Sequence, residues 1–396
     1  MNVVLDGRSL ASPAMRGWDR YTVGLVRALV ARGIAVTLAH RERSPLCLPH
    51  VEGIDCRTVA LADRGGLSWE QVSLPRYLAQ AKADVYHAPA EHGVPLVSPC
   101  PVTLTVHSVT TASYRSLIAS GVLAGRISDY LDVPNAGAVR SMKDVYYRFQ
   151  LRRPEHIFTP SRFCRDEVIE HLGAAPERVT ATPLAVGSEF TAPMTDGATR
   201  AATLARHGVV APYLLYVGGF ERHKNVAGLL DVFAEVKRVR ADLSLVIVGS
   251  GAVPDDLRAC ASRRGLRVDR DVRFLSNVTA DLVALYDAAE LFVSLSWRES
   301  FGLPALEAMS RGVSVIVSGL GAAREVVGDV GTLVNPSRPD EIVRAIVGAL
   351  AMSPSAREQQ RSRAVRRSRE FSWSATADRT IAVYEALVRR ELVAAS

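Results

Sequence analysis

Short apolar runs separated by amphipathic stretches recur along most of the chain. In the first half the runs that predict strands lie at 2–6, 34–39, 85–87, 102–106 and 157–159. Each run ends where polar or small residues begin, which is typical of buried parallel strands. A helix predicted at about 18–31 follows the first run, so the chain opens as a β-α-β unit.

The second half repeats this pattern more regularly. Its predicted strands lie at 213–217, 243–248, 272–275, 291–293 and 313–317. Helical stretches such as 226–238 and 280–289 lie between them. Strands that alternate with helices of this length predict a doubly wound sheet with right-handed crossovers.

The length of 396 residues is too great for one ordinary core and suits two domains. The prediction is an α/β protein with Rossmann-like parallel-sheet domains at 1–190 and 200–372 that face each other across a cleft. Residues 373–396 are expected to form a helix that packs back toward the N-terminal domain. Ligands of such sheets bind beyond the carboxyl ends of the strands, so the chemistry should lie on strand-end loops.

Composition and charge narrow the possible functions. Hydrophobic residues make up 48% and charged residues 22%, which argues against disorder. The absence of a run of eighteen apolar residues or of a leader-like start predicts a cytoplasmic protein. The net charge of +7 is compatible with nucleic acid, an anionic membrane or an anionic substrate. Aromatic residues reach only 6%, without basic and aromatic interleaving, so nucleic acid is not expected as a partner.

Neither a metal site nor a cofactor is predicted. His87, Glu91 and His92 are close in sequence, but they lack the spacing of a catalytic zinc site, and no suitable Asp-x-Asp motif occurs. The cysteines are odd in number and scattered, which indicates reduced structural thiols. They are Cys47, Cys56, Cys100, Cys164 and Cys260.

The stretch ESFGLPALE at 299–307 follows a predicted strand and enters a helix near Pro304. It places Glu299 on the strand-end loop and Glu307 in the first turns of the helix. Carboxylates accept hydrogen bonds from sugar hydroxyls and diols, and the N–H groups around Gly302 suit an anion. Taken singly, Glu307 is explained about equally well as a solvated helix residue and Glu299 as an acid at a helix start, without any ligand.

A second candidate loop, at 218–225, also follows a strand and precedes a helix. Gly218 and Gly219 allow a ligand to approach the backbone, and Arg222 and Lys224 offer the charge that a leaving diphosphate needs. Asn225 is expected to cap the helix. A solvated basic turn is the competing explanation.

Together these motifs resemble the family 4 retaining glycosyltransferases of group 1, whose signature is Glu, seven residues, Glu. Further similarities, among them Arg20-Tyr21, Asp84-Val-Tyr-His87 and Pro160-Ser161, span most of the chain. The resemblance implies the two-domain GT-B fold, with acceptor binding in the first domain and nucleotide-sugar binding in the second.

The resemblance also implies roles for individual residues. Catalytic roles fall to His107, Arg222, Lys224 and Glu299, with Glu299 on the donor sugar and His107 beside it. The family commonly has Asp after this His, where this chain has Ser108. The expected donor-binding residues are Gly17, Gly218, Gly219, Ser300, Phe301, Gly302, Leu303 and Glu307, the last of these on the ribose.

The function expected from this resemblance is retaining, metal-independent transfer from a nucleotide-diphosphate sugar of the mannose, rhamnose or hexosamine type. The acceptor would be a hydroxyl of a glycan, a lipid-linked sugar or a small molecule. Another GT-B activity, such as a sugar phosphorylase or a nucleotide-sugar epimerase, and a non-catalytic sugar-nucleotide-binding subunit are the alternatives.

Two features bear on contact with a membrane. Residues 112–153 carry an apolar stripe at helical spacing, which indicates core or, less often, a lipid groove. A set of arginines could attract the inner face of the plasma membrane, in a peripheral contact, or an anionic acceptor. A solvated helix face also explains these arginines. These are Arg152, Arg153, Arg361, Arg363, Arg366, Arg367 and Arg369.

Overall fold

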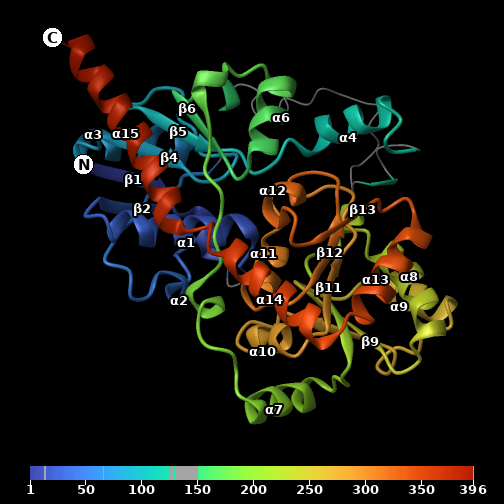
Figure 1. Ribbon diagram of the computed structural model, residues 1–396. Coiled ribbons are helices and arrows are strands. Elements are labelled where there is room, and N and C mark those ends of the chain that lie inside the picture. The colour runs from blue at the N-terminus through green and yellow to red at the C-terminus, as the bar shows by residue number, and fades with distance from the viewer. Residues whose placement is uncertain (13–14, 66, 125–128, 131–149, 396) are drawn as a thin grey trace. The chain divides into compact units, whose positions relative to one another are not determined.

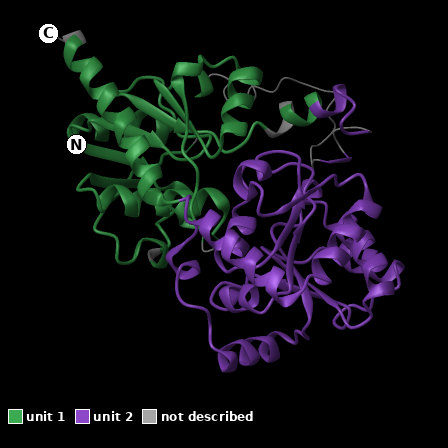
Figure 2. Cartoon of the chain, viewed as in Figure 1, with its two compact units in different colours: residues 1–116, 137–185, 372–396 green, residues 117–136, 186–371 purple. Residues whose placement is uncertain are grey.

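The computed structural model describes residues 1–12, 15–65, 67–124, 129–130 and 150–395. The chain divides into two compact units, each with its own parallel sheet (Figure 2). The first comprises Met1–Ser116, Gly137–Ala185 and Ser372–Ser396, and the second Leu117–Ala136 and Val186–Phe371. The predicted fold class, two Rossmann-like α/β domains, is confirmed.

The sheet of the first unit has the strand order β3-β2-β1-β4-β5-β6-β7 (Figure 1). Its strands are β1 (Asn2–Asp6), β2 (Ala35–Arg41), β3 (Arg57–Leu61), β4 (Val85–Ala88), β5 (Val102–Thr105), β6 (His156–Thr159) and β7 (Val179–Ala181). Every residue of β4, β5 and β6 is buried, because helices cover both faces of such a sheet. The chain reverses direction across the sheet between β1 and β4, which are neighbours.

The sheet of the second unit has the order β10-β9-β8-β11-β12-β13. Its strands are β8 (Tyr213–Val217), β9 (Ser244–Gly249), β10 (Val272–Ser276), β11 (Leu291–Ser294), β12 (Val315–Ser318) and β13 (Thr332–Val334). The direction of winding changes between β8 and β11, which pair in parallel. In sheets of this kind ligands bind at the carboxyl ends of the strands beside such a switch point.

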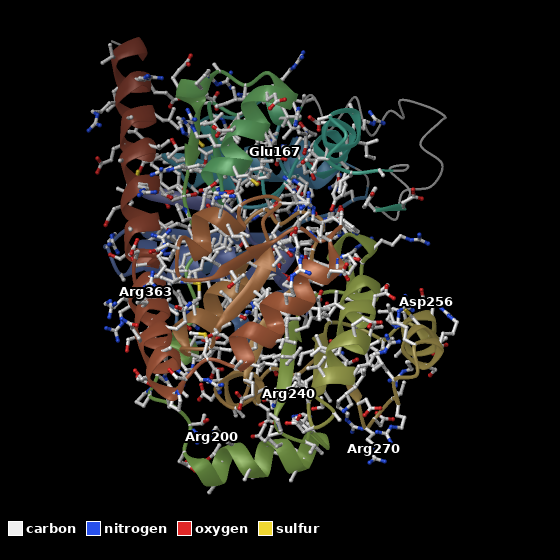
Figure 3. All side chains as sticks on the ribbon, turned by 45° about the vertical axis from the view of Figure 1, so that its right-hand side comes forward. Glu167, Arg200, Arg240, Asp256, Arg270 and Arg363 are labelled. Atoms are coloured by element: carbon white, nitrogen blue, oxygen red, sulfur yellow. The ribbon has the colours of Figure 1, made fainter. Side chains whose placement is uncertain are left out.

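The connecting helices vary in length in both units. The longer ones, in chain order, are α1 (Gly17–Val30), α3 (Leu74–Gln80), α4 (Thr110–Ala119), α6 (Arg162–Leu172), α7 (Gly197–His207), α8 (Val226–Val239), α9 (Asp255–Arg263), α10 (Leu282–Asp287), α11 (Leu303–Ser310), α13 (Pro339–Leu350), α14 (Pro354–Ser368) and α15 (Trp373–Ala395). The short ones are α2 (Leu48–Val51) and α12 (Ala323–Val327). Exposed charged residues such as Asp256 and Arg270 lie on the outside of the second unit (Figure 3).

The last helix, α15, belongs to the first unit and packs against α1. The indole of Trp373 lies on the backbone of Gly24, so closely that a Cβ added at Gly24 would clash with atoms of the ring. Further along α15, the hydroxyl of the fully buried Tyr384 meets Nδ1 of His87 on β4. The core of the first unit therefore includes side chains from both ends of the sequence.

Two helical glycines allow a test of this packing. Gly24→Ala should destabilise the protein by about 1–3 kcal/mol, because the added methyl group overpacks the Trp373 contact. Gly348→Ala on α13, where a Cβ meets nothing within 4 Å, should instead stabilise it by about 0.5–1 kcal/mol through higher helix propensity. Calorimetric unfolding midpoints of the two variants should move in opposite directions, and a raised midpoint for Gly24→Ala would contradict the packing described.

Candidate functional site

Two strand-end loops of the second unit carry most of the predicted site residues. One follows β8 and leads through a single 3-10 turn, Arg222–Lys224, into α8. The other follows β11 and leads through Glu299 into α11. Because β8 and β11 are parallel neighbours, both loops leave the same edge of the sheet.

Two hydrogen bonds join the two loops. The side-chain amide of Asn225 donates to the carbonyl of Leu295 at 3.0 Å, and the N–H of Trp297 donates to the carbonyl of His223 at 2.9 Å. Asn225 occupies the N-cap position of α8, but its side chain makes no capping hydrogen bond. The prediction that Asn225 caps the helix is therefore wrong, since its amide is used to fasten the neighbouring loop.

Lys224 and Glu299 form an ion pair where the two loops meet. The ammonium of Lys224 lies 2.9 Å from Oε1 and 3.1 Å from Oε2 of Glu299, and the Ser296 hydroxyl donates to Oε1 at 2.7 Å. Burial alone would raise the pKa of Glu299, but Lys224 and Ser296 outweigh it and hold the pKa below its ordinary value. Both side chains stay about one fifth exposed, at 22% and 21%, so each can still reach a ligand.

The backbone of Glu299 is held from the opposite side by the loop after β12. Ala322 donates its N–H to the Glu299 carbonyl at 2.9 Å, and Glu299 donates to the Leu320 carbonyl at 3.4 Å. Gly321 lies between them with a φ of +99°, a conformation that L side chains rarely adopt. A Cβ at this position would also collide with the Glu299 backbone, so only glycine fits.

The ion pair lines a pocket at this edge of the sheet. Gly302, with a φ of +95°, is the N-cap of α11, and the first turns of that helix also line the pocket. A helix N-terminus and an ammonium group both attract anions, and the carboxylate accepts hydrogen bonds from hydroxyl groups. The lining residues are Val217, Lys224, Phe292, Ser294, Glu299, Gly302, Pro304, Ala305, Val317, Ser318 and Ala323.

Four other predicted residues lie on these two loops, the donor-binding Gly218, Gly219 and Ser300 and the catalytic Arg222. Gly218 donates its N–H to the Val248 carbonyl at 3.0 Å, and the Gly219 carbonyl accepts from the Tyr216 hydroxyl at 2.8 Å. Arg222 is exposed at the start of its turn. The hydroxyl of Ser300 accepts a hydrogen bond from Arg298 at 3.2 Å.

Three of the predicted donor-binding residues in the 299–307 motif have buried side chains. Phe301 packs edge-on against Phe371, with ring centroids 5.8 Å apart, and Leu303 is also in the interior. Only their backbone atoms are therefore available to a ligand in this arrangement. Glu307 is 1% exposed, accepts a hydrogen bond from the Tyr286 hydroxyl at 2.9 Å, and does not line the pocket of Glu299.

Two of the predicted residues, His107 and Gly17, belong to the first unit. His107 follows β5, and its Nε2 lies 2.8 Å from the carbonyl oxygen of Pro89. Since a carbonyl only accepts, Nε2 carries the proton and Nδ1 keeps a lone pair in the neutral ring. Burial lowers the pKa of His107 below its ordinary value, although the carboxylate of Glu91 opposes the shift. Gly17 is exposed and opens α1.

Sequence reasoning missed several residues that shape the site. Ser296 precedes Glu299 by three residues, and this spacing on a tight loop could have suggested its hydrogen bond. Gly321 and Tyr286 carry no local signal, because they lie 22 and 13 residues from Glu299 and only the fold brings their loops to the motif.

Two arginines of the predicted cluster, Arg363 and Arg367 on α14, have partners within the second unit. Arg363 pairs with Asp329 at 2.7 Å, and Arg367 donates to the Val326 carbonyl at 3.2 Å and to the Glu325 carbonyl at the end of α12. These contacts favour the solvated helix face over a free anion-binding cluster. None of the helices in the described residues has the length and apolar content needed to cross a membrane. Much of the predicted 112–153 stripe lies outside the described residues.

Comparisons with known proteins cover both halves of the chain. A family model described as glycosyl transferases group 1 matches residues 207–369, and one described as glycosyltransferase family 4 matches residues 15–190. The chain is 34% identical over 233 residues to O-antigen chain mannosyltransferase B of Escherichia coli, a match that covers 58% of this chain and 60% of that relative.

A second relative is matched over nearly its whole length. The D-inositol 3-phosphate glycosyltransferase of Segniliparus rotundus is 32% identical over 402 residues, which cover 94% of this chain and 85% of the relative. Among solved structures, Anabaena Alr3699/HepE in complex with UDP-glucose superimposes with a TM-score of 0.75 at 15% identity, covering 98% and 100% of the two chains. That likeness shows the fold.

Proposed function

Because the chain belongs to the family 4 glycosyltransferases of group 1, with the GT-B fold, we propose that it transfers a sugar from a nucleoside diphosphate donor to an acceptor hydroxyl. We further propose that the anomeric configuration of the sugar is retained. The observation that carries this proposal is the Lys224–Glu299 ion pair, which lines a pocket beside the N-terminus of α11.

Each charge of the pair has a proposed task. The Lys224 ammonium, helped by Arg222, stabilises the negative charge that grows on the departing diphosphate. The ionised Glu299 carboxylate accepts hydrogen bonds from hydroxyls of the donor sugar. The direct contact between Lys224 and Glu299 fixes the two charges relative to each other.

The remaining predicted residues are proposed to bind the donor around this pair. The backbones of Gly218, Gly219 and the 300–303 turn are proposed to contact the phosphates and the sugar. Glu307 is assigned to the ribose, which requires it to exchange its hydrogen bond with Tyr286 for one to the diol. In the first unit, His107 is assigned to the transferred sugar and Gly17 to the diphosphate.

The proposed reaction needs no nucleophile from the protein. The bond between the anomeric carbon and the phosphate oxygen breaks, and the acceptor oxygen bonds to the same face of that carbon. The departing phosphate oxygen takes the acceptor proton, so the products are the glycoside and a nucleoside diphosphate. In this proposal Lys224 and Arg222 stabilise the charge of the leaving diphosphate in place of a divalent ion. We therefore expect a chelator to leave the rate of sugar transfer unchanged.

The names of two relatives support a proposal for the donor and acceptor classes. One is named as a mannosyltransferase and another as an inositol 3-phosphate glycosyltransferase. We therefore propose a donor of the mannose, rhamnose or hexosamine type. The proposed acceptor is a glycan, a lipid-linked sugar or a small molecule such as an inositol phosphate, and a lipid-linked acceptor would require peripheral contact with a membrane.

A donor screen followed by product analysis tests the proposal. A bound donor at a hundred times its dissociation constant should stabilise the protein by about 2.7 kcal/mol, which thermal-shift measurements detect. With each stabilising donor and the acceptor panel, we expect nucleoside diphosphate release and a retained anomeric configuration by NMR, with or without chelator. Sugar phosphate formed from free phosphate would indicate a phosphorylase instead. An isomerised donor without acceptor would indicate an epimerase, and binding without turnover a non-catalytic subunit.

A further inference from the structure

Glu91 lies on the loop after β4, beside the turn that carries His107 after β5. Its Oε1 accepts the backbone N–H of His107 at 2.7 Å and that of Ser108 at 2.9 Å. One carboxylate oxygen therefore binds two successive N–H groups. Charge-assisted hydrogen bonds of this length are among the stronger ones in proteins.

The half-buried Glu91 carboxylate binds backbone N–H groups. Among the residues that the structure describes, no lysine or arginine forms an ion pair with Glu91. Residue 108 is a serine, so the acid that faces the turn comes from the neighbouring strand-end loop. The negative charge of Glu91 thus lies next to the backbone of His107. Burial lowers the pKa of His107, and this charge opposes that effect.

His107 is held at its other polar groups as well. The buried thiol of Cys164 donates to the His107 carbonyl at 3.5 Å, and Nε2 binds the Pro89 carbonyl. The ring of Tyr21 packs edge-on against the imidazole, with centroids 5.1 Å apart. With its N–H, carbonyl and ring all bound, His107 has a single orientation, and Glu91 provides the part of this arrangement that carries a full charge.

We propose that Glu91 is a positioning residue that fixes the turn bearing His107 and so aims the unprotonated Nδ1 at the transferred sugar. This inference rests on the proposed function of His107. It predicts that Glu91 acts only through His107, without contact to either substrate. A displacement of about 1 Å in such a group can cost about a hundredfold in rate.

A double-mutant cycle tests the proposal in the full-length protein. Glu91→Ala should lower kcat by about ten- to a hundredfold, with little change in the KM of the donor. Glu91→Gln keeps an oxygen that accepts both N–H groups, and should retain a rate within about fivefold of the unchanged protein. Since residues that act as one unit are not additive, Glu91→Ala combined with His107→Ala should be no slower than His107→Ala alone.

Glu155, which immediately precedes β6, offers a matched control because it also binds the backbone of β5. It accepts the backbone N–H of Val102 at 2.7 Å, at the opposite end of β5. Glu155→Ala should leave kcat unchanged. In NMR spectra, the amide protons of His107 and Ser108 should shift upfield in Glu91→Ala and stay in place in Glu91→Gln and Glu155→Ala. Should Glu91→Ala fail to fold, Glu91→Asp, with the charge kept but the reach shortened, should show the same loss of kcat.

The outcomes separate this inference from the proposed function. If His107→Ala keeps the full rate, the role of His107 in the reaction is wrong, whatever the amide shifts show. If His107→Ala is slow but Glu91→Ala is not, or if the two losses multiply in the double variant, the positioning role of Glu91 is overturned. Equal losses in Glu91→Ala and Glu155→Ala would also overturn it, because they would indicate a general loss of structure.

Discussion

Replacing Lys224 with alanine is expected to lower kcat of sugar transfer by about 10²–10³-fold, the usual cost of removing one preorganised group that stabilises transition-state charge. The variant leaves the partly buried Glu299 carboxyl with the hydrogen bond from the Ser296 hydroxyl but without the ammonium group beside it. Donor binding should weaken too, because the diphosphate and the carboxylate would then repel each other. Steady-state rates and calorimetric titration with the nucleoside diphosphate measure the two effects.

An exposed arginine on the helix that follows provides the control. Arg238 on α8 pairs with Glu235 at the surface, where an ion pair contributes little. Arg238→Ala should keep the full rate. If Lys224→Ala also stays within about threefold of the unchanged protein, a loss far below that of a charge-stabilising group, Lys224 cannot be the residue that stabilises the leaving group.

Gly321→Ala is expected to reduce the rate by about a hundredfold, the cost of moving a catalytic group by about 1 Å. The added Cβ would lie only 2.8 Å from the nitrogen of Glu299, closer still to its carbonyl oxygen, at a φ that alanine avoids. Relief of this clash moves the Glu299 backbone and with it the carboxylate that meets Lys224. The midpoint of thermal unfolding should fall as well, since such backbone strain costs about 1–3 kcal/mol.

Gly319, two residues earlier on the same loop, is the matched control for this prediction. A Cβ at Gly319 would have its nearest neighbours at 3.7 Å, an ordinary contact, and its φ is not in the left-handed region. Gly319→Ala should therefore keep both rate and stability. Equal behaviour of the two variants would show that the close approach of Gly321 to Glu299 is not what holds the carboxylate in place.

The fold was largely predictable because its central strands are buried on both faces. The runs at 2–6 and 213–217 coincide with β1 and β8, and the other predicted strands differ from the observed ones by one or two residues at an end. β3, β7 and β13 were not predicted. All three lie at the edges of the sheets, where β3 has exposed residues and the other two are three residues long.

The candidate site was predictable only as far as its motifs are local. Lys224 and Glu299 each follow a strand, but their direct contact spans 75 residues and depends on β8 and β11 being neighbours. Asn225 shows the limit of local rules, since a tertiary acceptor, the Leu295 carbonyl, replaced the expected helix cap. The burial of Glu307 against Tyr286 likewise depends on how α10 and α11 pack.

The contribution of α15 to the first unit has a consequence for biosynthesis. A ribosome completes β1 to β7 long before it makes Trp373 and Tyr384, which fill the interior beside Gly24 and His87. At about 5–20 residues per second, residues 186–371 take roughly 10 to 40 s to translate. During that interval the first unit lacks the side chains that pack beside Gly24 and His87, so its core is completed only after the second unit has been made.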